Sequence, residues 1–533
     1  MLYFRILEAL SAPGSRKPVT VRATAQIPEH MAVEVSSFEL GLEPEAVSSV
    51  RNHAHPLDEG KPRLLDRWLD VVVAASGSSF ALLATIAIVL LWAIMGVRYG
   101  GSEDWQVVIS DVQAVFCYVF DSLLMRQQLN SYESSFRLAA SFQSRAVGTR
   151  RMLRQLKSQE VADHIPAGDI AIQHNSMWST RIPRDGLITR AILFTGRFLS
   201  HVVTLTMFWV CIFIWLGFGC YCDWSVRWQL YINSATSALM MICFAMIACI
   251  RELNRARTNA HLLHISQLDE ALEFQLRQMT GDTDPNAEIT IYPCKVNRLH
   301  RAISYYADLV GTLVGIVLLM TIVVVWVAIG PSLHFSSSWW LIIGTYAGLI
   351  GMHDGFVLHN LQSQLNQHRE LAMAEAWPDD VDNLAVIGLT AVRSRAATNT
   401  KVSIARWLSC RLSYICAHEY AVILGIILIV GLVVAATALK WSVTGQLLCN
   451  IPPSIIETFI MMALITSQSL DEATQREHFE QLEIARETLK QWVARVGVVR
   501  IEENDKAPNV KIETCTSPAH TETSGLVAED QVA

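Results

Sequence analysis

The sequence is poor in charge for its length. Asp, Glu, Lys and Arg make up 17% of its 533 residues, whereas soluble proteins contain about 25%. Its 11 cysteines form no CxxC pair of the kind that binds structural zinc, and no Walker-type glycine loop or HExxH motif occurs. These absences argue against a soluble protein, a nucleotide-driven pump and a zinc protease. The net charge of −7 is small, and we expect no nucleic-acid partner.

Apolar runs take the place of the missing charge. A run of about 20 such residues is long enough to cross a bilayer as a helix. Eight runs qualify, at roughly 71–95, 106–125, 192–219, 229–250, 307–330, 339–360, 419–439 and 446–467. They must be helical because lipid cannot satisfy exposed backbone groups, and they do not alternate as barrel strands would. The sequence therefore predicts an all-α integral membrane protein with eight transmembrane helices.

A tryptophan pattern divides the eight helices into pairs. Trp92, Trp215 and Trp326 are each followed by a glycine four residues later and by a second tryptophan thirteen residues later. Apolar runs flank each copy, and tryptophan favours the membrane–water interface. We therefore expect four repeated two-helix hairpins, with this pattern at the outer turn of three of them. The fourth lacks the first tryptophan.

The distribution of Lys and Arg predicts the topology. Basic residues gather between the hairpins, whereas the turns inside them hold only Arg98, Arg227 and Lys440. Positive segments stay in the cytosol, so both termini should be cytosolic. No secretory signal is expected in MLYFRILEAL, which contains Arg5 and Glu8. Cytosolic helical extensions with apolar faces would suit a homodimer.

The expected organisation follows from these patterns. An irregular cytosolic segment should occupy 1–60, and a disordered tail 498–533. Between them we expect three hairpin repeats with cytosolic helices, at 61–160, 185–285 and 401–497, and a further hairpin repeat at 295–375.

The second helix of each hairpin repeats a polar register. Equivalent positions near the outer end hold Ser110, Asn233, Gly344 and Asn450. Eighteen residues later stand Gln128, Arg251, Gln362 and Gln468. Eighteen residues are five helical turns, so both positions lie on one face. Repeats of this kind often place a substrate site at their interface.

Placing a charged residue inside a bilayer costs free energy, so each such residue indicates a structural or functional role. Three second helices carry a carboxylate on one face, at Asp121, Asp354 and Glu457. Two first helices bring His201 and His418 to a similar depth. Carboxylate and neutral imidazole suit a borderline divalent metal such as Fe(II), Mn(II) or Zn(II). We predict these five residues as metal ligands. The alternatives are histidines that bridge helices and carboxylates that pair with Arg or stay protonated.

Other residues on these faces are candidates for a pathway: Cys117, Met240, His353, Glu419, Gln128 and Gln468. Methionine in a span is more often a packing residue, and the glutamines would cap the inner end. An ion must also leave a transport site, so its ligand set should be incomplete. We expect no tightly bound cofactor.

Two stretches resemble a known family. INSATSALMMICFAMIACIRELNRARTNAHLLHISQLDE and DVQAVFCYVFDSLLMRQQLNSYE are similar to the low-affinity iron permease family and its longer fungal members. The resemblance covers about 62–480, and the fourth repeat departs most, at Pro452 and Pro453. It implies low-affinity uptake of Fe(II) across the plasma membrane by a multi-pass protein, with Zn(II), Cu or Mn(II) as further cargo.

Two other functions stay open on the residues alone. The same histidines and acids could hold a catalytic metal in a membrane-embedded metalloenzyme, although they come from separate repeats. The chain could also be a membrane scaffold or sensor whose intramembrane charges only fix helix pairing. The residues favour a transporter without enzymatic activity.

Overall fold

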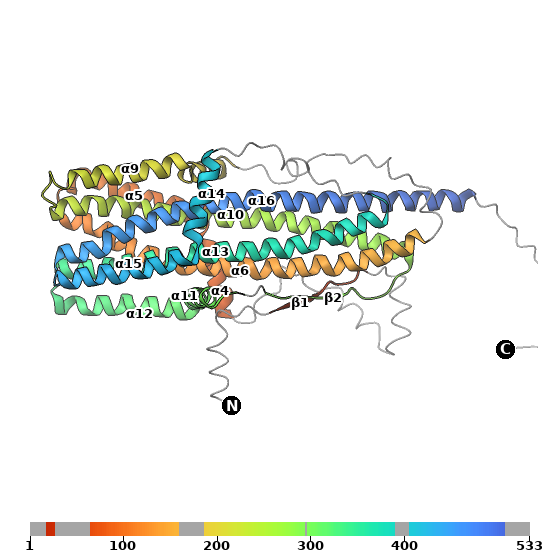
Figure 1. Cartoon of the computed structure of the whole chain (residues 1–533), viewed down its shortest axis with the longest axis horizontal. Helices are drawn as coiled ribbons and strands as arrows, with labels where there is room; N and C mark the ends of the chain where they lie inside the picture. The colour runs from red at the N-terminus through yellow and green to blue at the C-terminus, as the bar shows by residue number, and fades with distance from the viewer. Residues whose placement is uncertain (1–17, 27–63, 159–185, 294–295, 390–403, 507–533) are drawn as a thin grey trace, which may run out of the picture.

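Helices make up nearly all of the described chain. The structure is a computed structural model that describes residues 18–26, 64–158, 186–293, 296–389 and 404–506. Four segments share one order of elements: a short helix, an outer helix, a turn and a long helix (Figure 1). The short helices are α4 (Leu64–Ser76), α8 (Leu187–Leu199), α11 (Arg298–Val310) and α14 (Ile404–Ala417). The outer helices are α5 (Ser79–Tyr99), α9 (Val202–Phe218), α12 (Leu313–Ile329) and α15 (Glu419–Ala438). A 3-10 turn, η4 (Gly330–Leu333), follows α12. The long helices are α6 (Glu103–Lys157), α10 (Val226–Thr280), α13 (Ser337–Val386) and α16 (Val443–Lys506).

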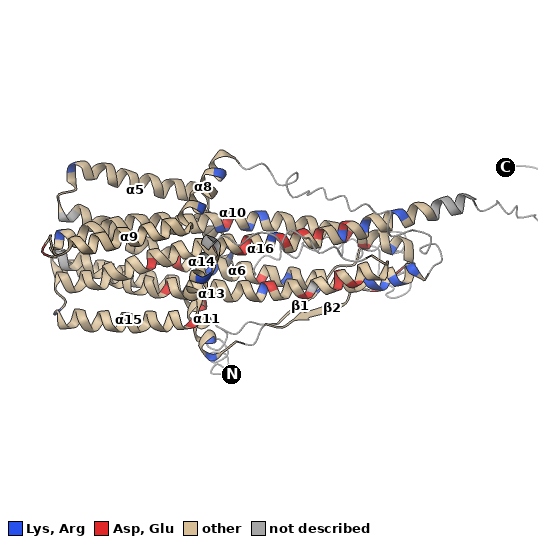
Figure 2. Ribbon diagram, turned by 45° about the horizontal axis from the view of Figure 1, so that its top comes forward, with Lys and Arg blue, Asp and Glu red and all other residues tan. Residues whose placement is uncertain are grey.

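The apolar helices confirm the prediction of an all-α membrane protein. In the described chain seven helices are long and apolar enough to cross a membrane, or eight if the bent pair α8 and α9 counts as one span. A 55-residue helix such as α6 is about 83 Å long, whereas the hydrocarbon core is about 30 Å thick. Only the first part of each long helix therefore lies in the membrane. The remainder, after Gln128, Arg251, Gln362 and Gln468, is termed the helical extension. Figure 2 shows that most charged residues lie there.

A break separates each short helix from the outer helix that follows. The apolar runs predicted single spans from 71, 192 and 307, but the helices end at Ser76, Leu199 and Val310 and restart after a few residues. The bend between α8 and α9 is 58°. In Figure 1 the short helices lie near one level along the bundle. The hydropathy of the run hid the break, because both helices are apolar on at least one face.

Long helices hold these breaks in place. Thr466 donates a hydrogen bond to the Ser200 carbonyl (3.0 Å), and Asn360 donates one to the Ala417 carbonyl (2.6 Å). At Gly77 a Cβ atom would lie 2.9 Å from the carbonyl oxygen of Ala248. Small residues at the breaks therefore let the chain approach a long helix closely.

The tryptophan pattern closes the outer turns. Trp92 stacks on Trp105 with ring centroids 4.3 Å apart, and its Nε1 donates to the Trp105 carbonyl. Trp215–Trp228 and Trp326–Trp339 stack in the same way. The conserved spacing includes a glycine because an aromatic ring covers it: at Gly96 a Cβ atom would lie 2.4 Å from the Trp105 ring. The pattern is thus a clamp between the two helices of the first three outer turns.

The four long helices form the central bundle. Each packs along two others, in the cyclic order α6, α10, α16, α13, and the outer helices lie outside them (Figure 1). Residues that face the bundle interior are the most buried of the chain, for example Phe244, Met240 and Leu358 at 0% exposure. The bundle axis is therefore the place where residues from all four segments can meet.

The helical extension has its own apolar core and buried ion pairs. Leu153, Leu276 and Trp492 are among its core residues. Arg486, 3% exposed, contacts Asp269 at 2.7 Å and Asp380 at 3.6 Å. Burial raises the pKa of Asp269 to about 7, while the charge of Arg486 acts in the opposite direction. These contacts tie α10, α13 and α16 together.

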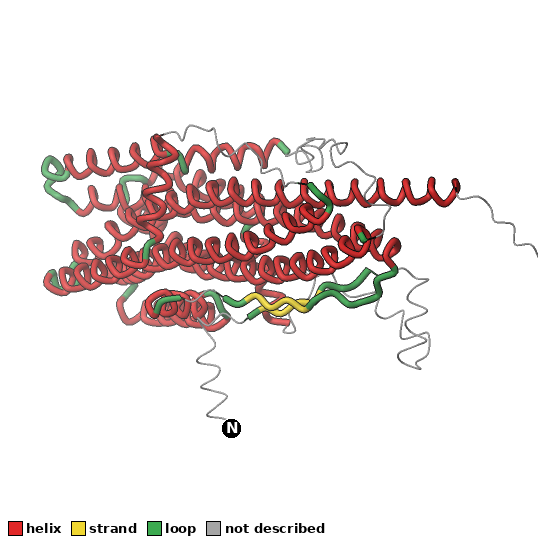
Figure 3. Tube along the Cα trace, turned by 45° about the vertical axis from the view of Figure 1, so that its right-hand side comes forward, coloured by secondary structure: helices red, strands yellow, loops and turns green. Residues whose placement is uncertain are grey.

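Two strands lie along the helical extension (Figure 3). β1 (Val19–Arg22) pairs antiparallel with β2 (Glu288–Ile291) in a two-stranded sheet. The sequence predicts an irregular segment at 1–60, so the strand at 19–22 is a difference; residues 1–17 and 27–63 lie outside the described residues. Likewise α16 continues to Lys506, beyond the expected start of the tail at 498, and 507–533 lies outside them. The third long helix also runs past the predicted boundary of 375, to Val386.

Candidate functional site

Three fully buried carboxylates lie in the middle of the central bundle. Asp121 is on α6, Asp354 on α13 and Glu457 on α16, and each has 0% exposure. The charges of Asp354 and Glu457 both act on Asp121, so the three are within electrostatic reach of one another. Asp121 lies sixteen residues after Trp105, about 24 Å along the helix from the outer turn. The structure therefore brings together the three predicted carboxylates.

Most oxygens of this acid cluster lack a hydrogen-bond donor. Among the described residues, none donates to either oxygen of Asp121, to either oxygen of Glu457, or to Oδ2 of Asp354. The remaining oxygen, Oδ1 of Asp354, accepts a hydrogen bond from the Tyr306 hydroxyl at 2.6 Å. Buried carboxylates without donors are costly inside a membrane. A bound cation is one way to offset that cost.

The backbone of α13 packs directly against the acid cluster. Gly351 lies beside Glu457, and a Cβ atom at Gly351 would be 2.7 Å from both carboxylate oxygens. A glycine is required here because the carboxylate occupies the space of a side chain. Within the described residues, no group of three or more His, Cys, Asp and Glu side chains has the spacing that holds a metal ion.

Soft and amide donors lie on the outer side of the acids. Gln113 donates to the Cys117 sulfur at 3.3 Å and to the Met240 sulfur at 3.1 Å. The Ser237 hydroxyl donates to the Gln113 carbonyl oxygen at 3.2 Å. The charges of Glu457 and Asp121 also act on Cys117. Cys117 and Met240, both predicted for the pathway, therefore meet beside the acid cluster through Gln113.

A polar layer lies further toward the outer turns. Asn450 donates to the Ser110 hydroxyl at 3.3 Å, and Gly344 packs against the Asn450 amide. Asn233 is fully buried, and neither of its amide atoms has a hydrogen-bond partner within the described chain. The polar register of the sequence thus faces the bundle axis.

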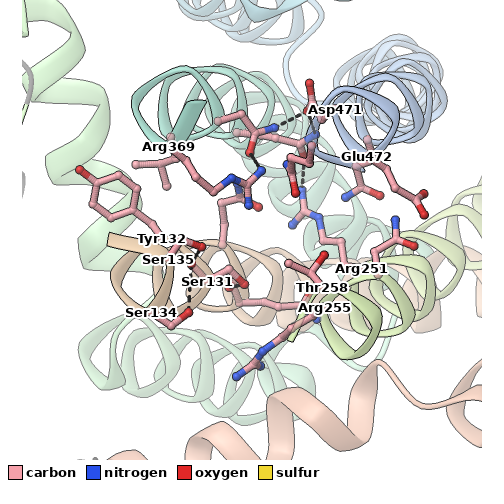
Figure 4. A pocket seen from close by; sticks show the side chains of 18 of the residues that line it. Ser131, Tyr132, Ser134, Ser135, Arg251, Arg255, Thr258, Arg369, Asp471 and Glu472 are labelled. Atoms are coloured by element: carbon pink, nitrogen blue, oxygen red, sulfur yellow. Dashed lines mark hydrogen bonds between the residues drawn. The ribbon is translucent and has the colours of Figure 1, made fainter. Parts of the chain in front are cut away.

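An aliphatic ring separates the acids from the inner end. Its four members occupy equivalent positions, about one turn beyond Asp121 and Asp354 and two turns beyond Glu457, and none is more than 1% exposed: Leu124, Ile247, Leu358 and Leu464. One further turn on lies a polar pocket of about 110 Å³, whose lining includes Gln128, Arg251, Gln362 and Gln468 (Figure 4). Along the axis, acids, aliphatic ring and polar pocket therefore follow one another.

The two predicted histidines lie elsewhere. His201 and His418 cap the N-termini of α9 and α15, where their Nδ1 atoms accept hydrogen bonds from the backbone N–H of Val203 and Tyr420. His201 is exposed and His418 half-buried. The helix break explains the difference: a continuous helix would have carried these residues inside the span, whereas the break makes them caps.

Glu419 and His353, both predicted for the pathway, contact residues other than the three carboxylates. Oε2 of Glu419 lies 3.2 Å from Nδ1 of His300 on α11. The ring of His353 packs edge-on against Tyr306 with centroids 4.9 Å apart. Tyr306 itself donates to Asp354, so His353 contacts a residue that holds the cluster.

Sequence reasoning missed two contributors, Tyr306 and Gln113, and one further buried acid, Asp111. Tyr306 comes from a short helix, and repeat spacing gives no indication of it. Gln113 and Asp111 lie in a span, and the rule that intramembrane polar groups need a reason would have selected both. Asp111 is 6% exposed, and its Oδ2 has no hydrogen-bond partner in the described part of the chain.

Known proteins match this chain along most of its length. The profile of a family described as low affinity iron permease matches residues 190–280, 297–406 and 404–521. The chain is 30% identical over 502 residues to a low-affinity iron/zinc ion transport protein of Schizosaccharomyces pombe, which covers 92% of this chain and 85% of the relative. It is 28% identical to a low-affinity Fe(2+) transport protein of Saccharomyces cerevisiae, over 81% of this chain and 83% of the relative. No solved structure matches.

The three matched stretches begin near α8, α11 and α14 and each contains a short, an outer and a long helix. They cover more than half of the chain, so the match does not depend on one motif. With the relatives covering most of the length, this chain belongs to the low affinity iron permease family.

Proposed function

We propose that this chain carries Fe(II), and zinc as a second cargo, across the plasma membrane with low affinity, along the axis of the central bundle. The relatives are named as low-affinity iron and iron/zinc transporters. Membership of a permease family also agrees with the prediction that the chain is not an enzyme. The observation that carries the proposal is the acid cluster of Asp121, Asp354 and Glu457, buried where four segments meet.

The cluster is the proposed cation site. Carboxylate oxygens bind divalent cations in general, and the neighbouring Cys117 and Met240 sulfurs add the softer donors that favour transition metals. Five of its oxygens lack donors among the described residues, and because the three groups do not have the spacing to ligate one ion together, an ion bound there would keep part of its water shell. A cluster that leaves part of the ion's coordination to water would bind it weakly enough for release.

The orientation follows from the basic residues. The helical extension with its many Lys and Arg side chains (Figure 2) faces the cytosol, and so do both termini. An inside-negative potential then favours inward movement of a divalent cation by roughly 4.6 kcal/mol per 100 mV. This driving force is enough for uptake without nucleotide hydrolysis.

Metal uptake into vesicles that contain the purified protein tests the proposal. Asp121→Asn, Asp354→Asn and Glu457→Gln keep the side-chain volume and remove the charge, and each should reduce Fe(II) uptake at unchanged protein level. Glu133→Gln, on an exposed turn of α6, is the matched control and should carry metal like the wild type.

The outcomes separate the alternatives. Wild-type vesicles that carry no metal would favour a scaffold or sensor. Metal that copurifies and does not exchange would favour a resident catalytic ion. Undiminished uptake in all three carboxylate variants would remove the site assignment and leave the transport proposal in place.

A further inference from the structure

One position on the bundle axis breaks the repeat. At the inner end three long helices carry a glutamine, and α10 carries Arg251 instead. Arg251 is 8% exposed and lines the polar pocket (Figure 4). A guanidinium repels cations, so its place at the mouth of a cation pathway requires an explanation.

Arg251 reaches across the bundle from α10. Its Nη1 donates to the Leu124 carbonyl on α6 at 3.2 Å, and its Nη2 donates to the Gln362 side chain on α13 at 2.5 Å. Leu124 belongs to the aliphatic ring. The guanidinium therefore lies directly against the inner side of that ring and joins three elements of the closed bundle: two long helices and its own.

A carboxylate on the fourth long helix offers Arg251 another partner. The charge of Asp471, on α16, acts on Arg251. Asp471 accepts hydrogen bonds from Gln362, at 3.5 Å, and from Asn366. Gln362 thus contacts both Arg251 and Asp471, so a short movement of the guanidinium would exchange one acceptor for the other. In Figure 4 the side chain of Arg251, on α10, extends toward the side of the pocket where Asp471 lies on the neighbouring α16.

We infer that Arg251 is the inner gate of the metal pathway: bound to Leu124 and Gln362 it closes the inner end behind the aliphatic ring, and paired with Asp471 it opens it. This inference rests on the proposed function, because it assigns the step by which the cargo leaves the acid cluster. The positive charge blocks cations in the closed state. Pairing with Asp471 neutralises that charge as the passage clears.

Arg251→Gln is the direct test, because glutamine is the residue at the three equivalent positions. Without the guanidinium the inner end should stay open, and metal flux into vesicles should rise about tenfold. Arg255→Gln is the matched control: it removes the same charge from the same pocket, on the same helix, from a residue paired with Glu252 at 3.8 Å. Because Glu252 balances the charge of Arg255, this change should raise the flux far less than Arg251→Gln does.

Gln362→Leu keeps the inference testable if Arg251→Gln does not fold. It removes an acceptor of the closed state and should also raise the flux. Asp471→Asn removes the partner of the open state and should lower it. Flux that is unchanged or reduced in a folded Arg251→Gln protein, while wild-type vesicles carry metal, would overturn the gate alone.

A second measurement does not depend on metal transport. Cys117 lies on the outer side of the aliphatic ring, so a positively charged thiol reagent applied from the helical-extension side must pass Arg251 to reach it. Labelling that disappears in Cys117→Ser should be faster in Arg251→Gln than in the wild type. Equal rates would overturn the gate, whereas faster labelling in vesicles that carry no metal would support it and refute only the proposed function.

Discussion

Gly351→Ala should weaken metal uptake although it leaves every carboxylate in place. The added Cβ atom would lie 2.7 Å from both oxygens of Glu457. Contacts of a Cβ atom shorter than 3.0 Å are essentially never observed. Glu457 is fully buried, so its carboxylate cannot retreat into solvent. It must shift away from α13 and from the acid cluster.

The size of the effect follows from the overlap. Overpacking of a well-packed interior costs about 1–3 kcal/mol. If that cost falls on the position of the carboxylate, the half-saturating metal concentration should rise about 5- to 150-fold. Alanine favours helix over glycine by up to about 1 kcal/mol, so the protein itself should remain folded.

Gly355→Ala provides the matched control, because it makes the same change one turn further along α13. There the nearest atom to the new Cβ is the Met461 methyl group at 3.4 Å, an ordinary contact. Concentration-dependent Fe(II) uptake into vesicles should show the shift for Gly351→Ala only. Equal half-saturation in both variants and the wild type would refute the role of the Glu457 position.

Three further changes test the fold around the site. Gly96→Ala places a methyl group 2.4 Å from the Trp105 ring and should lower the free energy of unfolding by about 1–3 kcal/mol, measured as a lower Tm in detergent; an unchanged Tm would contradict the clamp. Arg486→Met leaves two buried carboxylates without their cation and should cost about 3–5 kcal/mol, whereas Arg476→Met, in an exposed pair, should cost less than about 0.5 kcal/mol; similar losses would contradict the importance of burial. Burial lowers the pKa of His261, in the helical extension, to about 4, from about 6.5 when unfolded. As the pH falls, the unfolded chain therefore protonates His261 before the folded chain does. The contribution of neutral His261 to stability is present above pH 6.5 and is lost as the pH falls toward 4. His261→Gln should reduce the drop in Tm between pH 7 and pH 5, and an identical drop would contradict this assignment.

The carboxylates were predictable because they depend on helix periodicity alone. Asp121, Asp354 and Glu457 belong to helices that remain continuous from the outer turn to the cytosolic end. In a continuous helix a residue's face and depth follow from its number. Counting residues from the tryptophan pattern, and for Glu457 from Asn450, therefore predicted that the three lie at similar depths.

The histidines were not predictable by the same counting. His201 and His418 follow the breaks, and an apolar run has the same composition whether the helix is continuous or bent. Hydrogen bonds from other segments, such as that from Asn360 to the Ala417 carbonyl, hold the breaks in place. A residue's depth after a break depends on those distant partners.

The sequence by itself determined the membrane class, the recurrence of one tryptophan pattern and the family resemblance, because these depend on composition, period and local motif. Only the tertiary structure decided which side chains meet. The cyclic order of the long helices brings Gln113 of α6 against Met240 of α10 and brings Arg251 of α10 to the Leu124 carbonyl of α6. Such contacts join residues more than a hundred positions apart, and their geometry is set by packing among helices rather than by any one helix.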